Sequence, residues 1–322
     1  SNISLQFNDT DDYSSVLGNV RKKYPANIFG RGLIKMDDIY EFQTAYATKK
    51  DDLNEFIRNT CLELSKKHSN KAKAIPVVPE EVDVYQYIDK ATSLKKIPVG
   101  ISHEYVDIEY FDFLSNYTTI ISSQDAENIS SFVEALSVVL ANVNNTSLLI
   151  FDPESTLNID STDTIAVSNN NFDESFGKLA NMISEQYDIY VHDGYSNKNI
   201  INNRKMMIFI NDFDKFLTKI GPDNKKKFEE TIINGKELGI FGFVLCDMST
   251  GFKKYEYDSW YKSVIASNYG IWIGNGVTDQ TTIKATIPYR NNLKEIGNKN
   301  GVIVKNSKPY LVKLIKKGVE EI

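Results

Sequence analysis

The sequence predicts an α/β protein in which a mostly parallel sheet is covered by helices on both faces. Two observations carry this prediction. From about residue 97 onward, strand-like and helix-like segments alternate along the chain. The strand-like segments, such as "SLLIF" and "GFVLC", are almost continuously apolar. Such runs are typical of parallel strands whose two faces are both buried.

The first 98 residues follow a different pattern. A short apolar segment, "ISLQF", is strand-like, and the apolar positions of residues 51–67 recur with helical spacing behind an acidic pair. The proline-marked segment "AIPVVPEEV" ends this helix, and a shorter helix is expected over "VYQYID". Cys61 in the first helix and Cys246 in a later strand are expected to be small core residues of a reduced chain.

The alternating region predicts its elements in order. Strands are expected in "YTTIIS", "SLLIFDP", "TIAVS", "KMMIFINDFDKFL", "IFGFVLCDM" and "YGIWIGNG". Helices are expected in "AENISSFVEALSVVLANV", "FDESFGKLANMISEQYDIYV" and "NKKKFEETIINGKELG", the last of them ended by Gly239. The segment "NGVIVKNSKPYLVKLIK" predicts a hairpin that turns at Asn306 and Ser307, and it shares its pattern weakly with "GRGLIKMDDIYEFQTAYA" near the start.

Composition limits the function. A chain of 322 residues with 41% hydrophobic and 25% charged residues is globular and long enough for two domains. No run approaches eighteen apolar residues, and the polar, acidic start does not resemble a secretory signal, so no membrane insertion is expected. A net charge of −6 argues against a nucleic-acid partner, because phosphate binding needs clustered lysines and arginines.

The segment "YTTIISSQDAENISSF" places a strand, a polar turn and a helix where a phosphate-binding loop would lie. In that pattern Ser123 and Asn128 take the places of the two glycines, and Ile129 takes that of the lysine. The hydroxyl that would hold Mg²⁺ is present as Ser130. The neighbouring Ser122, Asp125 and Glu127 complete the segment, and the two carboxylates would repel a triphosphate. An ordinary strand–helix turn is the alternative.

A second segment, "MMIFINDFDKF", has the form of a Walker B strand, in which an apolar run ends in two acidic residues. In a working motor the first carboxylate helps to hold Mg²⁺ and the second orients the attacking water. Asn211 and Asp212 occupy these places, so the first charge is missing. Together with Ser122, Ser123, Asn128, Ile129 and Ser130, they form a degenerate nucleotide-binding slot.

Three segments carry a family resemblance: residues 24–47, 95–113 and 259–285. In the same order, and over nearly the whole chain, they resemble the C-terminal part of the EssC family. These proteins are FtsK/SpoIIIE-type coupling ATPases of type VIIb secretion systems. The resemblance implies a RecA-like P-loop NTPase fold. It assigns residues 1–47 to the tail of a preceding ATPase domain, 48–98 to a helical connection and 99–322 to a degenerate third ATPase domain.

The resemblance also implies partners and a setting. The partners are secreted WXG100-type proteins and related export substrates, together with other domains and subunits of a motor that is hexameric at full length. The fragment would be a cytoplasmic domain of a cell-membrane protein, one whose family acts in virulence. Mg-ATP is the implied cofactor, and the degenerate motifs predict that it binds weakly or not at all.

An aromatic run, "GFKKYEYDSWYKSV", gives candidate partner-binding residues, since Tyr and Trp are enriched where proteins bind one another. The alternative is a short helical segment that packs over the sheet edge, and both hold if one face packs and the other binds a partner. The candidates are Phe252, Tyr255, Tyr257, Trp260 and Tyr261.

No catalytic residue and no metal site are predicted. His68, His103 and His192 have the setting of surface or turn residues, and neither cysteine has zinc-ligand spacing to a histidine. The favoured function is a degenerate ATPase domain that recognises or gates export substrates. The alternatives are a slow ATPase that binds Mg-ATP at a non-consensus loop and, less favoured, a DNA translocase.

Overall fold

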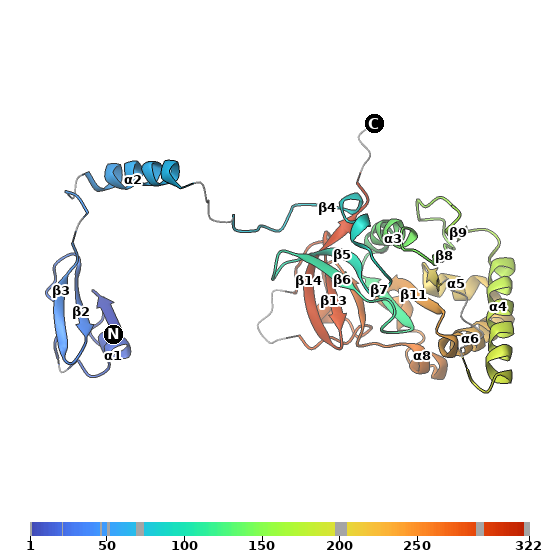
Figure 1. The fold of residues 1–322 in the computed structure, drawn as a ribbon. Helices are drawn as coiled ribbons and strands as arrows, with labels where there is room; N and C mark the ends of the chain where they lie inside the picture. The colour runs from blue at the N-terminus through green and yellow to red at the C-terminus, as the bar shows by residue number, and fades with distance from the viewer. Residues whose placement is uncertain are drawn as a thin grey trace. The chain divides into compact units, whose positions relative to one another are not determined.

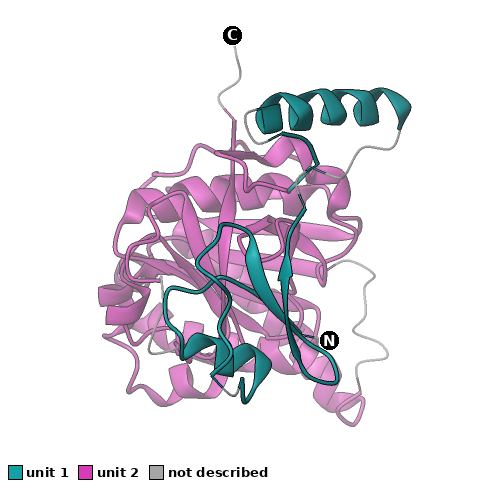
Figure 2. Ribbon diagram, turned by 90° about the vertical axis from the view of Figure 1, so that its left-hand side faces the viewer, with its two compact units in different colours: residues 1–75 teal, residues 76–322 magenta. Residues whose placement is uncertain are grey.

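A computed structural model describes residues 2–20, 22–45, 47–49, 52–68, 74–196, 205–287 and 293–318. The chain divides into two compact units, residues 1–75 and 76–322, which Figure 2 colours separately. Among the described helices, none combines the length and the apolar composition that a bilayer crossing requires.

The first unit is a three-stranded antiparallel sheet with a short helix. Its small core contains Tyr13, Leu17 and Leu33. Its longest helix, α2, has no buried residue, so Cys61 is exposed and the expectation that it is a core residue is wrong. The elements are β1 (Asn2–Leu5), α1 (Asp12–Leu17), β2 (Arg31–Lys35), β3 (Ile39–Gln43) and α2 (Leu53–Lys67).

The second unit is built on a large sheet whose parallel part has the strand order β12-β7-β11-β10-β8-β9 (Figure 1). The mostly parallel sheet expected from the sequence is therefore confirmed. If β9 is left out and the other five strands are numbered by their order along the chain, they lie in the sheet in the order 5-1-4-3-2. The parallel strands are β7 (Thr118–Ser123), β8 (Thr146–Phe151), β9 (Ile165–Ser168), β10 (Lys205–Ile210), β11 (Phe241–Met248) and β12 (Gly270–Ile273).

An antiparallel part extends the sheet beyond β12 through β13, β14, β5 and β6. The β13–β14 hairpin turns at Asn306 and Ser307 as expected, with φ angles of 51° and 64°. Positive φ at both central residues is the signature of a tight type I′ turn. The antiparallel strands are β5 (Ile97–Ser102), β6 (Ile108–Phe111), β13 (Asn300–Lys305) and β14 (Lys308–Lys316), and the short β4 (Val82–Asp83) pairs with β14 in parallel.

Helices cover both faces of this sheet, as the sequence predicted (Figure 1). Successive residues of β7 point into different cores: Ile121 packs in the core beneath α3, and Ile120 packs in the core beneath the other helices. The helices are α3 (Ala126–Ala141) on one face, and α4 (Phe172–His192), α5 (Phe213–Lys219), α6 (Gly221–Leu238), α7 (Ser249–Phe252) and α8 (Ser259–Val264) on the other.

The segment that leads into β5 belongs to the second unit, with Val82 and Val84 buried in the α3-side core. The short helix expected over residues 84–89 consists instead of two 3₁₀ turns, η2 (Val84–Gln86) and η3 (Ile88–Lys90). Asp83 caps the first by accepting a hydrogen bond from the Tyr85 backbone N–H at 3.2 Å. The domain limits implied by the family resemblance stay a prediction.

Candidate functional site

The candidate ligand-binding site lies at the carboxyl ends of β7 and β11. These strands are neighbours, yet α3 follows β7 onto one face and α7 follows β11 onto the other. Such a switch opens a crevice at the carboxyl edge of a parallel sheet, and open α/β folds bind ligands there. The degenerate slot expected from the sequence lies at this edge.

The turn between β7 and α3 contains only Gln124 and Asp125. The Asp125 carboxylate caps α3 by accepting a hydrogen bond from the Glu127 backbone N–H at 3.0 Å. The Ser123 hydroxyl donates to the Ile273 carbonyl at 2.9 Å and accepts from the Asp125 N–H at 3.1 Å. The strand thus continues to the residue that replaces the first glycine, and no loop remains to surround phosphates. The helix N-terminus is occupied by a carboxylate of the chain itself.

The remaining residues of the predicted slot lie apart from one another. Ile129, in the place of the lysine, is 2% exposed and packs in the α3-side core. Ser122 is fully buried, and its hydroxyl has no hydrogen-bond partner in the described structure. Asn128 and Ser130 are half-buried on the first turns of α3. These residues do not converge on a phosphate position.

Asn211 is committed to a buried structural hydrogen bond at the end of β10. Its side-chain N–H donates to Asp152 Oδ1 at 3.1 Å and to the Thr156 hydroxyl at 2.9 Å. Asp152 Oδ2 accepts from the Leu157 backbone N–H at 2.9 Å. Asp152 is not among the residues predicted from the sequence, although its position directly after an apolar strand is a usable signal. The Asn211 amide, at the first Walker B position, therefore donates a hydrogen bond to the buried carboxylate of Asp152.

Asp212 follows in a left-handed conformation, with φ 46° and ψ 61°. Burial raises the pKa of its carboxyl group, and the negative charges of Asp152 and Glu154 raise it further. A carboxylate at this place is retained, but it lies among other carboxylates, so its environment does not favour a polyphosphate.

A third strand end, that of β11, adds Asp247. Its Oδ2 accepts a hydrogen bond from the Asp214 backbone N–H at 2.8 Å, at the start of α5. The Asp214 carboxylate accepts from the Tyr255 hydroxyl at 2.9 Å and pairs with Lys254. Burial raises the pKa of Asp247 to about 6. This edge of the sheet is acidic, and Lys254 is already paired within it.

Lysines near this edge already interact with its acids. Lys219 pairs with Glu154 at 3.2 Å, and the charges of Lys215 and Lys219 partly offset the raised pKa of Asp212. The described Asp, Glu, His and Cys side chains include no group of three or more that could hold a metal ion. An anionic ligand would therefore meet several carboxylates here, beside lysines that are already paired with carboxylates of the chain.

The aromatic candidates for partner binding are mostly core residues. Phe252, Tyr255, Trp260 and Tyr261 are between 1% and 7% exposed, and they pack in the core beneath α4–α8. This burial fits the alternative that the segment packs over the sheet, and partner binding by this segment stays a prediction. Tyr257 is different, because 78% of its surface is exposed.

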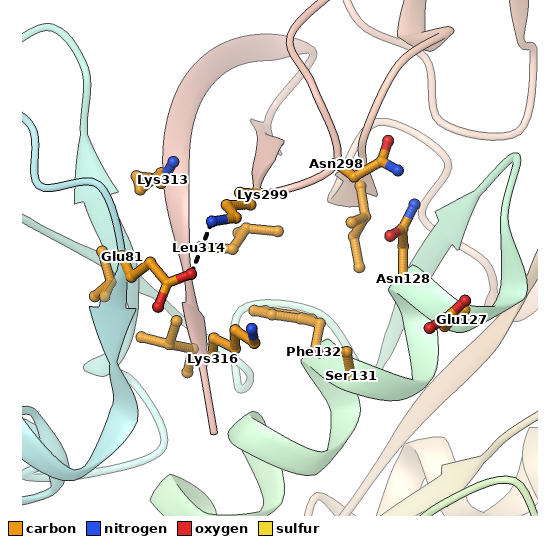
Figure 3. Close-up of a pocket in the computed structure, with 13 residues that line it drawn as sticks. Glu81, Glu127, Asn128, Ser131, Phe132, Asn298, Lys299, Lys313, Leu314 and Lys316 are labelled. Carbon is orange, nitrogen blue, oxygen red and sulfur yellow. Dashed lines mark hydrogen bonds and ion pairs between the residues drawn. The ribbon is translucent and has the colours of Figure 1, made fainter. Parts of the chain in front are cut away.

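A pocket of about 240 Å³ opens beside the first turns of α3, between this helix, β14 and the segment at residues 81–82 (Figure 3). Its apolar wall is formed by Phe132, Ile273 and Leu314. Glu81 and Lys299 pair across one side at 2.7 Å, as the dashed line in the figure marks. The volume is below the roughly 300–1,000 Å³ of sites that enclose a small-molecule ligand. It suits one or two apolar side chains of a peptide.

The polar groups of this pocket are amides and lysines. Asn128 and Asn298 lie close together, since both have side-chain atoms 3.5 Å from the position that a Cβ on Gly274 would take. Lys313 and Lys316 also line the pocket, and neither forms a salt bridge within the described residues. The pocket therefore offers an apolar wall, hydrogen-bonding amides and two unpaired positive charges.

The parallel sheet of the second unit and the position of the slot define the fold of a P-loop ATPase domain. No family model matches the sequence, and no curated protein resembles it significantly. Solved structures do share the fold, and they include the cytoplasmic domain of a type VII secretion ATPase.

The cytoplasmic domain of EssC superposes with a TM-score of 0.61 at 15% identity, covering 96% of this chain and 62% of that one. EssC (ATPases 2 and 3) from Geobacillus thermodenitrificans gives 0.62 at 16% identity, covering 97% and 60%. EccC (ATPases 2 and 3) from Thermomonospora curvata, in complex with a signal sequence peptide, gives 0.63 at 14% identity, covering 96% and 57%. The chain thus spans about three fifths of the length of these structures, and the expected fold is confirmed.

Asn211→Asp is expected to destabilise the protein rather than to restore a Walker B site. The substitution removes the amide donor and places a second carboxylate against buried Asp152, so the free energy of unfolding should fall by about 3 kcal/mol at neutral pH. Urea denaturation measures the change. Adding Asp152→Asn exchanges the two groups and should recover part of the loss. Equal stability of the single variant and the wild type would show that the bond contributes nothing.

Asp247→Asn is expected to change how stability depends on pH. The pKa of Asp247 is near 6 in the folded protein, which is above its value in the unfolded chain. Between about pH 4 and 6 the folded state therefore binds more protons than the unfolded state. As the pH rises through this range, ionisation of the buried carboxyl group lowers the stability of the wild type. The unfolding free energy of the variant minus that of the wild type should therefore increase by about 2 kcal/mol when the pH is raised from 4.5 to 7.5. Asp223→Asn, at an exposed position of α6, is the control and should show no such gain. A constant difference at both pH values contradicts the prediction.

Proposed function

We propose that this chain is a non-hydrolysing ATPase-fold module of a type VII secretion motor, and that it binds export substrates. The observation that carries the proposal is the capped turn between β7 and α3. Asp125 occupies the helix N-terminus that a phosphate would need, and Ile129 is buried where a lysine would reach the nucleotide. A P-loop fold without a usable phosphate site can still bind a protein substrate, and we assign that role to this chain.

The fold shared with EssC and EccC supports the secretion setting. The EccC structure with a signal sequence peptide supports a peptide as the ligand. By the resemblance, the substrates are WXG100-type proteins, and the motor is a membrane-anchored hexamer with this part in the cytoplasm. Residues 1–47, 48–98 and 99–322 would then be the tail of the second ATPase domain, the connection and the third ATPase domain.

The pocket beside α3 is the proposed peptide site. Phe132, Ile273 and Leu314 form an apolar wall for a side chain of the export segment. The unpaired Lys313 and Lys316 attract the carboxylates of that segment. The neighbouring amides can bond to an extended peptide backbone. These features match a short amphipathic segment better than a nucleotide, whose phosphates would also meet Glu81 and Glu127.

Calorimetric titration of Mg-ATP tests the first half of the proposal. Neither the wild type nor an Asp125→Ala, Glu127→Ala variant should bind with a Kd below about 1 mM. The variant removes the cap and the adjacent charge, but Ile129 still stands in place of the lysine. Saturable binding by the wild type would instead support a slow ATPase that uses Ser130 and Asp212.

Fluorescence anisotropy with a labelled C-terminal peptide of a WXG100-type protein from the same secretion system tests the second half. Ser131→Arg introduces a long side chain into the pocket and should weaken binding by at least about 10-fold. Ser130→Arg is the matched control, since Ser130 is the preceding residue of α3, is equally half-buried and does not line the pocket. Equal effects of the two substitutions would exclude this pocket as the site.

A further inference from the structure

A second groove, of about 500 Å³, lies on the opposite face of the sheet from the pocket beside α3. It is bounded by the loop between α7 and α8, by α8, and by residues 265–267 and 281–284. Its floor includes Phe252, Tyr261 and Ile265, which pack in or against the core beneath α4–α8. The floor is therefore apolar and is held by the fold.

Three lysines surround this floor. Lys253, Lys262 and Lys284 all line the groove, and all three are exposed. None of them forms a salt bridge within the described residues. Glu256 is the carboxylate among the described lining residues. Three lysines against one carboxylate give the groove a net positive charge on a protein whose net charge is −6.

The ring of Tyr257 is also available to a ligand. It is 78% exposed, and Lys262 Nζ lies 5.4 Å from its centroid.

We propose that this groove binds an acidic segment of a protein partner. Carboxylates of the segment pair with Lys253, Lys262 and Lys284, and an apolar side chain between them packs on the floor and against Tyr257. Charge complementarity of this kind steers association and fixes the register of a partner. The site is independent of the proposed peptide pocket, because the two are lined by different residues on opposite faces of the sheet.

A single-stranded nucleic acid is the rival ligand, because lysines and an exposed tyrosine also suit phosphates and bases. The charge of the chain argues against it. Nucleic-acid backbones are bound by a continuous basic track, whereas this groove holds three lysines on an acidic protein. In addition, no arginine lies among the described residues of the second unit, and arginine is the preferred residue for bidentate phosphate contacts.

Anisotropy with a labelled peptide of repeated Asp-Leu-Glu-Gly tests the proposal on the full chain. The peptide should bind at low salt, and a peptide of repeated Asn-Leu-Gln-Gly should not. Combined Lys253→Glu, Lys262→Glu and Lys284→Glu substitutions should weaken binding by at least about 10-fold. The matched control reverses Lys95, Lys226 and Lys308, which are also exposed, and it should bind as the wild type does.

Tyr257→Ser weakens binding without changing the net charge if the proposal holds, and Ser131→Arg, in the other pocket, leaves binding unchanged. The proposal is overturned if the acidic peptide does not bind, if both lysine variants lose affinity equally, or if the groove variant keeps it. It is also overturned if an oligothymidylate of equal charge binds more tightly than the peptide and loses affinity in the groove variant, because the ligand would then be a nucleic acid.

Discussion

Burial of β7 on both faces is the constraint on which the rest of the second unit depends. Every residue of this strand is buried between β11 and β12. Because its side chains pack alternately into the two cores, a shift by one residue would move each side chain into the opposite core and disrupt the packing of both. Ser123 is fixed to the Ile273 carbonyl, so the chain leaves the sheet at a defined point and enters α3 after two residues. The capped helix and the buried Ile129 follow from that exit.

The carboxylates at the carboxyl edge of the sheet are largely bonded to groups of the chain itself. They receive hydrogen bonds, from the Asn211 amide to Asp152 and from the Asp214 N–H to Asp247. These bonds offset part of the cost of burying charge, and the remainder appears as the raised pKa of Asp247. The nearby Lys219 and Lys254 neutralise carboxylates rather than a ligand. These carboxylates are thus hydrogen-bonded or paired within the chain.

Sequence patterns predicted the parts of the fold that local chemistry determines. The apolar runs predicted β7, β8, β10 and β11, and the paired residues of positive φ fit the predicted turn at Asn306 and Ser307. Contacts between distant residues were not predictable. Asn211 and Asp152 are 59 residues apart, and neither segment contains a pattern that predicts their hydrogen bond. Likewise, the composition of the aromatic run fits either a core or a docking surface. Only the structure distinguishes the exposed side chain of Tyr257 from its buried neighbours.

The two proposed binding surfaces share a cause in the distribution of charge. The chain is acidic overall, and near the carboxyl edge Lys219 and Lys254 form salt bridges. In contrast, no salt bridge within the described residues involves Lys313 or Lys316 on one face of the sheet, or Lys253, Lys262 or Lys284 on the other. Water solvates these charges until a partner binds, so they cost little in the free protein. An acidic, partly apolar protein segment, as proposed for both surfaces, would pair with the lysines and cover the apolar residues beside them.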